Sequence, residues 1–122
     1  MDSIASKMSA PVISIYSEAS AREGAKLMQE KGIGSLLVKG YDGYVGIVTE
    51  RDLVYKVVGS GLNPDTTPLS AIMTESILSI EKKASFSEAG DLMREYQIRH
   101  LAVEENEEII GILSAKDLIG RK

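Results

Sequence analysis

Two short stretches of this sequence place a hydroxyl side chain three residues before an aspartate. Residues 46–52 read Gly-Ile-Val-Thr-Glu-Arg-Asp, and residues 111–117 read Gly-Ile-Leu-Ser-Ala-Lys-Asp. At a helix start, free N–H groups and a hydroxyl can bind phosphate, an aspartate can accept both hydroxyls of a ribose, and a basic side chain can balance ligand charge. The glycine that opens each stretch leaves room for a ligand to approach. The candidate nucleotide contacts are Thr49, Arg51 and Asp52 in the first stretch, and Ser114, Lys116 and Asp117 in the second.

The same spacing also describes an ordinary helix start. In a capping box, the hydroxyl residue is the N-cap and an acidic residue three positions later bonds back to its backbone. The helix dipole also favours an acid in the first turn. Thr49 and Ser114 would then be N-caps with no ligand. From the residues alone, both interpretations stay open.

These stretches belong to an internal repeat that covers most of the chain. Residues 8–55 align with residues 73–120 at a constant offset of 65 without a gap, and about a third of the pairs are identical. A repeat of this length is one supersecondary unit that buries its apolar face against its copy. The sequence predicts a first repeat at residues 1–59, a linker rich in helix breakers at residues 60–67, and a second repeat at residues 68–122.

The elements of the first copy follow from local patterns. A β-branched run at residues 11–15 predicts a strand, and Ser20 with Glu23 forms a capping box that opens a helix ending near Gly32. Apolar runs at residues 35–38 and 45–48, joined through an Asp-Gly turn, predict a β-hairpin. A second helix is expected to start at residue 49.

The second copy repeats this order. It has a strand at residues 77–80, a helix opened by Ser85, a hairpin from residues 100–103 to residues 109–113, and a last helix from residue 114. The acidic run at residues 104–108 is expected to be a solvated five-residue turn. Each copy is thus β-α-β-β-α. The predicted fold class is α+β, with two repeats related by a pseudo-twofold axis, sheets packed face to face, and clefts between them.

Composition excludes several kinds of site. With no cysteine in 122 residues, disulfides, thiolate zinc sites and thiol nucleophiles are impossible, and the single histidine, His100, argues against histidine metal sites and triads. A net charge of −4 argues against a broad nucleic-acid or anionic-membrane surface. No apolar run approaches the ~18 residues of a membrane span, and the N-terminal residues show no targeting pattern. A cytoplasmic protein is expected.

Taken together, these features resemble a tandem pair of cystathionine β-synthase (CBS) domains, a Bateman module, as in stand-alone CBS-domain proteins. The resemblance extends from about residue 4 to residue 122. It rests on motifs at residues 8–9 and 73–74, 25–28 and 90–93, 98–103, and 46–53. It implies a non-catalytic sensor, with no catalytic cofactor or metal, that binds adenosine-containing ligands such as AMP, ADP, ATP or S-adenosylmethionine in two clefts between the repeats.

The resemblance assigns residues to both clefts. The first, favoured cleft would contain Val12, Ile13, Gly34, Ser35, Arg99, Ile112, Ser114, Lys116 and Asp117. The second would contain Ile47, Thr49, Arg51, Asp52, Ile77, Leu78 and His100. Family members often place a basic residue at the start of the second strand, where it reaches phosphate. Arg99 occupies that place in the second repeat and Gly34 in the first, so the Asp117 cleft is expected to bind phosphate more strongly.

Other functions remain as alternatives at this point. The resemblance also implies a flat homodimer formed through helices, and the helix faces at residues 53–54 and 93–96, expected to be exposed, are compatible with it. The alternative function is a dimerisation scaffold, in which the clefts are empty or filled by side chains. An enzyme with Asp52 or Asp117 as a base is disfavoured, because the sequence supplies neither a positioned nucleophile nor a metal-ligand cluster. The acidic balance gives no support to nucleic-acid binding.

Overall fold

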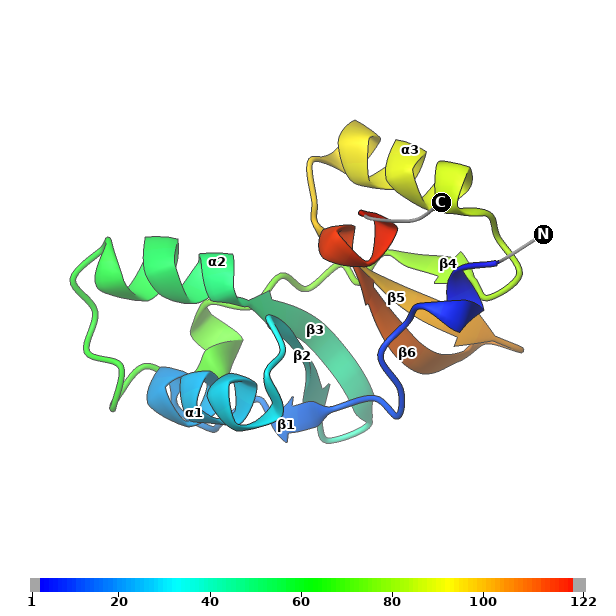
Figure 1. Ribbon diagram of the computed structural model, residues 1–122. Helices are drawn as coiled ribbons and strands as arrows, with labels where there is room; N and C mark the ends of the chain where they lie inside the picture. The colour runs from blue at the N-terminus through cyan, green and yellow to red at the C-terminus, as the bar shows by residue number, and fades with distance from the viewer. Residues whose placement is uncertain (1–2, 120–122) are drawn as a thin grey trace. The chain divides into compact units, whose positions relative to one another are not determined.

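The computed structural model describes residues 3–119 of the chain (Figure 1). These residues form two compact units: one consists of residues 13–77, and the other combines residues 3–12 with residues 78–119. In each unit a strand, an α-helix, two strands and a further helical segment follow one another along the chain, whereas an additional 3-10 helix comes last in the unit of residues 13–77 and first in the other unit. The predicted fold class, α+β with two repeats, is confirmed.

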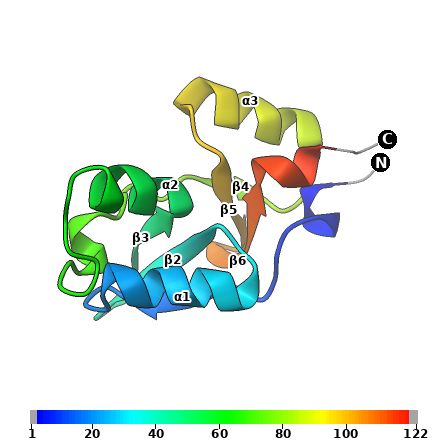
Figure 2. The same ribbon diagram turned by 60° about the vertical axis from the view of Figure 1, so that its left-hand side comes forward.

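The unit of residues 13–77 has a sheet in the order β1-β2-β3, with β1 parallel to β2 and β2 antiparallel to β3. Its helices pack on the sheet face that carries Leu36 and Val38, and Figure 2 shows them beside the strands. Its elements are β1 (Ser14–Tyr16), α1 (Ala21–Lys31), β2 (Ser35–Gly40), β3 (Gly43–Thr49), α2 (Glu50–Asp52), a π-helical continuation of α2 (Leu53–Val58) and a 3-10 helix (Leu69–Ala71).

The other unit has the same topology, with the sheet order β4-β5-β6. Its last helix, expected from residue 114, is a 3-10 helix of four residues rather than an α-helix. Its elements are a 3-10 helix (Ile4–Ser6), β4 (Ser79–Glu81), α3 (Phe86–Tyr96), β5 (His100–Glu105), β6 (Glu108–Ser114) and the final 3-10 helix (Ala115–Leu118).

The starts of the two long helices are the predicted capping boxes. The Ser20 hydroxyl accepts a hydrogen bond from the Glu23 backbone N–H at 3.1 Å, and the Ser20 N–H donates to the Glu23 carboxylate at 2.8 Å. Ser85 and Glu88 form the same pair of bonds in α3. Because these bonds span only three residues, a local sequence pattern is sufficient to predict them.

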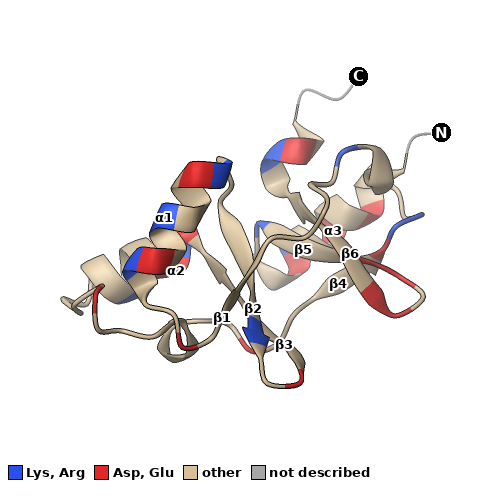
Figure 3. Cartoon of the chain, turned by 90° about the horizontal axis from the view of Figure 1, so that it is seen from below, with Lys and Arg blue, Asp and Glu red and all other residues tan. Residues whose placement is uncertain are grey.

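The hairpin of β5 and β6 differs from the prediction. The strands continue through Glu105 and resume at Glu108, so the turn has two residues, Asn106 and Glu107, with φ of 52° and 68°. The acidic run is therefore mostly strand: Glu104 accepts a hydrogen bond from Ser79 at 2.7 Å. Figure 3 shows the negative charge gathered at this hairpin. The expected five-residue turn is wrong because strand pairing extends into the charged residues.

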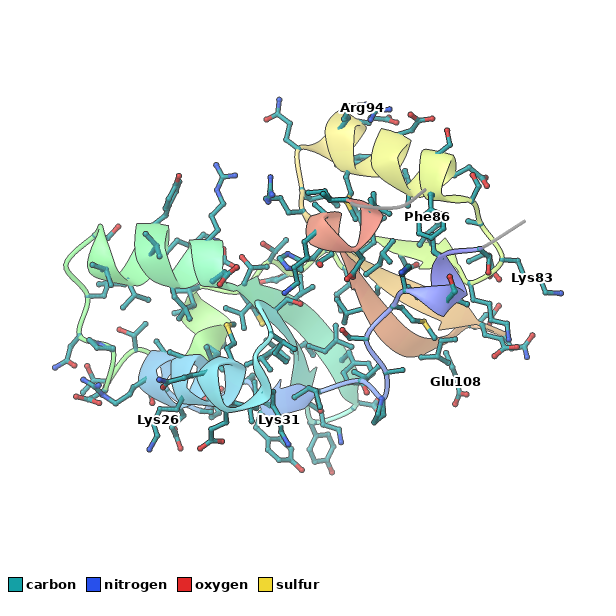
Figure 4. All side chains as sticks on the ribbon, in the orientation of Figure 1. Lys26, Lys31, Lys83, Phe86, Arg94 and Glu108 are labelled. Atoms are coloured by element: carbon teal, nitrogen blue, oxygen red, sulfur yellow. The ribbon has the colours of Figure 1, made fainter. Side chains whose placement is uncertain are left out.

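Each unit encloses its own apolar core. In the unit of residues 13–77, the core joins α1, the π-helical segment, β2 and β3, with the 3-10 helix that contains Leu69. In the other unit, α3 contributes Phe86, Ala89 and Met93 to a core with β4, β5 and β6. Figure 4 labels Phe86 on α3 and shows Lys83 directed away from the unit. The expectation that Met93 lies on an exposed face is wrong, because Met93 is 6% exposed.

Two short segments pair with the sheet of the opposite sequence repeat. Ser9 forms an antiparallel bridge with Ile112 through two hydrogen bonds of 2.8 and 3.0 Å. Thr74 forms the equivalent bridge with Ile47, with both hydrogen bonds at 2.9 Å. The first residues of each sequence repeat therefore belong to the unit that is built mainly from the other repeat. The boundaries of the sequence repeats thus differ from the boundaries of the folded units.

Residues 60–67, expected as a linker between the repeats, belong to the unit of residues 13–77 and pack on the start of α1. The carbonyls of Pro64 and Thr67 accept hydrogen bonds from Arg22 N–H at 3.0 Å and Ala21 N–H at 2.8 Å. The Arg22 guanidinium also forms an ion pair with Asp65. This segment thus satisfies N–H groups of a helix start that the capping serine does not reach.

Candidate functional site

The first candidate stretch forms a closed set of hydrogen bonds at the end of β3. The Asp52 carboxylate Oδ2 accepts from the Thr49 backbone N–H at 2.9 Å and from the Thr49 hydroxyl at 3.2 Å. The Asp52 backbone N–H donates to the Thr49 hydroxyl at 3.3 Å. Asp52 is buried, with 8% of its surface exposed. The capping box predicted from the sequence is present here.

Sequence reasoning missed a third member of this set, Lys56. Its Nζ lies 3.0 Å from Asp52 Oδ1 and donates to the Ile72 carbonyl at 2.9 Å. The spacing of four residues on a predicted helix was the signal that identifies such a pair. The buried carboxylate of Asp52 is therefore compensated by a lysine from its own helix.

The second candidate stretch repeats the geometry around one carboxylate oxygen. Asp117 Oδ2 accepts from the Ser114 backbone N–H at 2.8 Å and from the Ser114 hydroxyl at 3.2 Å. Among residues 3–119, no hydrogen bond or ion pair reaches Asp117 Oδ1, and the residue is half-buried. Position 121, which corresponds to Lys56 at the repeat offset, lies outside the described residues. The two aspartates thus present different acceptor capacities within the described chain.

Contacts within each unit explain why a glycine opens each of the two stretches. A Cβ on Gly46 would come within 2.7 Å of the Met73 sulfur and 2.8 Å of the Thr74 carbonyl oxygen. The interpretation that this glycine leaves room for a ligand is therefore wrong, because a segment of the same unit occupies the space. Gly111 stands in the same relation to Met8 and Ser9.

The segments that precede β2 and β5 lie beside these helix starts. The Glu50 N–H donates to the Gly34 carbonyl at 3.0 Å, and Ser35 pairs with Thr49 in the sheet register. In the other unit, the Ala115 N–H donates to the Arg99 carbonyl at 2.8 Å, and His100 pairs with Ser114. Arg99 is exposed and His100 half-buried. Arg99 therefore belongs to the same unit as Ser114 and Asp117.

The two basic residues inside the stretches have different surroundings. The Arg51 guanidinium lies 4.9 Å from the centre of the Tyr55 ring, in a cation–π contact on an exposed helix face. Lys116 is exposed. Arg51 is thus held along its own helix by the ring, which limits its freedom to reach a ligand elsewhere.

The predicted apolar contacts are divided between the units. Ile13, Ile47 and Ile77 belong to the unit of residues 13–77, whereas Val12, Leu78 and Ile112 belong to the other. Ile13 and Leu78 are anchored through their carbonyls, which accept from Leu37 and Ala102 N–H groups at 3.2 and 3.0 Å. Each predicted cleft draws on both units, so the two clefts stay predictions.

Two further properties of the described chain bear on function. Across residues 3–119, no three histidine, aspartate or glutamate side chains gather in a way that could hold a metal ion. No helix in that range is long and apolar enough to cross a membrane.

Comparison with known proteins identifies a domain family. The sequence model of the CBS domain family matches the chain twice, over residues 2–59 and residues 69–121. An uncharacterized protein of Methanopyrus kandleri is 42% identical over 101 residues, which are 81% of this chain and 52% of that protein. The present chain therefore spans about half the length of that relative.

Solved structures show the same fold. A CBS domain protein from Pyrobaculum aerophilum, complexed with AMP, has a TM-score of 0.87 at 26% identity, over 99% of this chain and 93% of that one. The hexameric CBS-CP12 protein from bloom-forming cyanobacteria has a TM-score of 0.90 at 29% identity, over 99% of this chain and 71% of that one.

Proposed function

The chain belongs to the CBS-domain family, and on this premise we propose that it is a non-catalytic regulatory module that binds an adenine nucleotide, AMP, ADP or ATP. The ligand is bound by the helix-start aspartates, which accept the ribose hydroxyls, and by neighbouring cations, which contact phosphate. The AMP complex of the Pyrobaculum aerophilum protein supports this ligand class.

The observation that carries the proposal is the hydrogen bonding of the two Asp117 carboxylate oxygens. One oxygen, Oδ2, is fixed by Ser114, so the group has a defined orientation. The other, Oδ1, has no partner among the described residues. A carboxylate oxygen can accept two hydrogen bonds, so Oδ1 alone can accept both hydroxyls of a ribose.

The Asp117 site is also proposed to be the stronger of the two for phosphate. Arg99 lies next in the chain to His100, which pairs with Ser114, and its exposed guanidinium supplies a cation. The equivalent position in the other unit is Gly34, which has no side chain. Arginine binds phosphate through paired N–H donors. The presence of Arg99 in place of a glycine therefore favours phosphate binding at the Asp117 site.

A thermal-shift panel with AMP, ADP, ATP and S-adenosylmethionine tests the proposal. A ligand present at about 100 times its dissociation constant stabilises the folded state by about 2.7 kcal/mol. We expect a shift with at least one adenine nucleotide, and a larger loss of affinity from Asp117→Ala than from Asp52→Ala. Each variant loses only about 0.5–1 kcal/mol of stability from the helix start itself.

The competing function is a scaffold whose clefts stay empty. It predicts no shift with any of the four ligands, and affinities that neither aspartate variant changes. Enzymatic turnover is a separate outcome: release of phosphate from ATP that Asp117→Ala abolishes would contradict the non-catalytic assignment.

We also propose that the chain forms a homodimer through its helices. Val54, Tyr55 and Val58 on the segment that continues α2 are exposed, and so is Tyr96 at the end of α3. A helix face of this kind is stabilised when a second copy covers it. Val58→Asp is expected to shift the mass measured by light scattering from dimer to monomer, whereas Lys26→Asp, at an exposed position of α1, leaves it unchanged. A hexamer, as named for the cyanobacterial protein, would contradict the dimer.

A further inference from the structure

The Asp52 carboxylate is already bonded by three groups of its own unit. Thr49 supplies two donors to Oδ2, and Lys56 Nζ lies 3.0 Å from Oδ1. Asp52 is 8% exposed, so this charge is largely removed from water. An ion pair that compensates a buried carboxylate is costly to break, because the uncompensated charge would remain in a poorly solvated place.

Lys56 is held from a second side as well. Its Nζ donates to the carbonyl of Ile72 at 2.9 Å, and Ile72 is a core residue that is 2% exposed. The segment that follows Ile72 is fixed in turn, because Thr74 pairs with Ile47 on β3. The ammonium therefore has a defined position between a buried carboxylate and a backbone carbonyl of the core, although 47% of its side chain is exposed.

Counting acceptor positions shows what this arrangement allows. The two oxygens of a carboxylate offer about four lone-pair positions. Thr49 fills two of them on Oδ2, and the Lys56 ammonium, in an ion pair 3.0 Å from Oδ1, covers a third. One position remains for a ligand, whereas a ribose with free 2′ and 3′ hydroxyls presents two donors. A vicinal diol must therefore displace the ammonium, or bind through one hydroxyl only.

We propose that Lys56 is a specificity-determining residue of the Asp52 site, an internal counter-ion that prevents this carboxylate from taking a ribose diol in the two-hydroxyl mode. The inference rests on the proposed nucleotide function, and it names the regulation of one of the two sites. With Lys56 in place, the Asp52 site gains little from the second hydroxyl. Removal of the ammonium frees Oδ1 and creates a preference for ribose over deoxyribose.

The test isolates the Asp52 site in an Asp117→Ala background of the full chain. Binding of AMP and of 2′-deoxy-AMP is measured by calorimetry, with and without Lys56→Met. We expect Lys56→Met to strengthen AMP binding about tenfold and to raise the ratio of AMP to 2′-deoxy-AMP affinity by a similar factor, as one further hydrogen bond to a charged acceptor allows. The ratio is informative because a general change in stability would affect both ligands alike.

Further variants separate charge from packing. Lys56→Arg retains the cation and is expected to give the same ratio of AMP to 2′-deoxy-AMP affinity as the Asp117→Ala parent. Lys56→Gln removes the charge but keeps a donor for the Ile72 carbonyl, and is expected to behave as Lys56→Met, which provides a second measurement if Lys56→Met folds poorly. The matched control is Lys26→Met on α1, where Figure 4 shows the side chain directed away from the unit. It is expected to leave both affinities and their ratio unchanged.

The outcomes distinguish this inference from the proposed function. If the unmutated chain binds AMP but neither Lys56→Met nor Lys56→Gln raises the ratio, the inference is overturned and the proposed function stands. If Lys26→Met produces the same increase, the effect is one of net charge and the inference is also overturned. If no variant and no unmutated chain binds AMP, ADP or ATP, the proposed function fails and the inference fails with it.

Discussion

The Met8 sulfur lies within 2.7 Å of the point where a Cβ on Gly111 would stand. The backbone carbonyl of Ser9 is almost as close, at 2.8 Å. Gly46 has the same relation to Met73 and Thr74. In each unit, a glycine in the last sheet strand is thus the place where a distant segment of chain packs directly on the backbone.

Gly46→Ala and Gly111→Ala are expected to destabilise the protein. The methionine side chain can move, but the carbonyl oxygen belongs to a bridged backbone and cannot move without breaking the bridge. Overpacking of this kind costs about 1–3 kcal/mol, measured by urea denaturation. Gly90→Ala in α3 is the control: its Cβ would make ordinary van der Waals contacts with the end of Arg94 at 3.5 Å and with Leu118 Cδ1 at 3.9 Å, so a gain of about 0.5–1 kcal/mol is expected. Equal losses at all three positions would contradict this account.

The ends of α1 and α3 differ at one position of the repeat. Both helices close with a left-handed residue, which is Gly32 (φ 65°) in α1 and Gln97 (φ 55°) in α3. Because a side chain is strained in this conformation, Gln97→Gly is expected to raise the free energy of unfolding by about 1 kcal/mol. Gln29→Gly, inside α1, should instead lower it by a similar amount. A loss of stability in Gln97→Gly would show that the strain is compensated elsewhere.

The first turn of α3 provides a test of local capping. Ser85→Ala removes the hydroxyl that accepts from the Glu88 N–H, and is expected to cost about 1 kcal/mol. Ser87→Ala lies in the same turn on an exposed position, and its stability should change little. Thermal denaturation of both variants is the measurement. Similar losses in the two would mean that capping is not the stabilising interaction.

The ion pair of Arg22 and Asp65 predicts a dependence on pH. The hydrogen bond from the Arg22 guanidinium lowers the pKa of the Asp65 carboxyl below its usual value of 3.8. A carboxyl whose folded pKa is depressed contributes stability above its unfolded pKa, and loses that contribution as pH falls through the folded pKa. Asp65→Asn should therefore be less stable than the parent near neutral pH.

The difference between the two proteins should shrink as the pH falls below 3.8, the usual pKa of the carboxyl, and disappear once the pH is below the lowered pKa of the folded protein. Both side chains are more than half exposed, so the effect is expected to be small and to weaken in about 1 M salt. Melting curves recorded against pH measure it. A difference that persists at low pH would mean that Asp65 acts through packing on α1 and not through its charge.

Much of the fold was predictable because it depends on neighbouring residues. Ser20 and Glu23 are three positions apart, and so are Thr49 and Asp52, so their hydrogen bonds follow from spacing alone. The constant offset of 65 residues extended each local prediction to the second copy. Where prediction failed, as in the turn at Asn106 and Glu107, the pairing of two strands outweighed the usual preference of charged residues for turns.

The site was predicted less completely. The sequence identified Asp52 and Asp117 as equivalent positions, but only the folded chain shows that Lys56 and the Ile72 carbonyl surround one of them. The role of Ile72 depends on the path of residues 69–74 over the sheet, which no local pattern describes.

The sequence by itself determined the helix starts, the presence of two hairpins and the two matching aspartates, because each depends on interactions a few residues long. The tertiary structure alone decided which segment covers Gly46 and Gly111, since the bridge of Ser9 with Ile112 joins residues about a hundred positions apart. Such contacts form only when burial of a shared apolar core offsets the entropy of closing a long loop. That balance is a property of the whole unit and not of any one stretch of sequence.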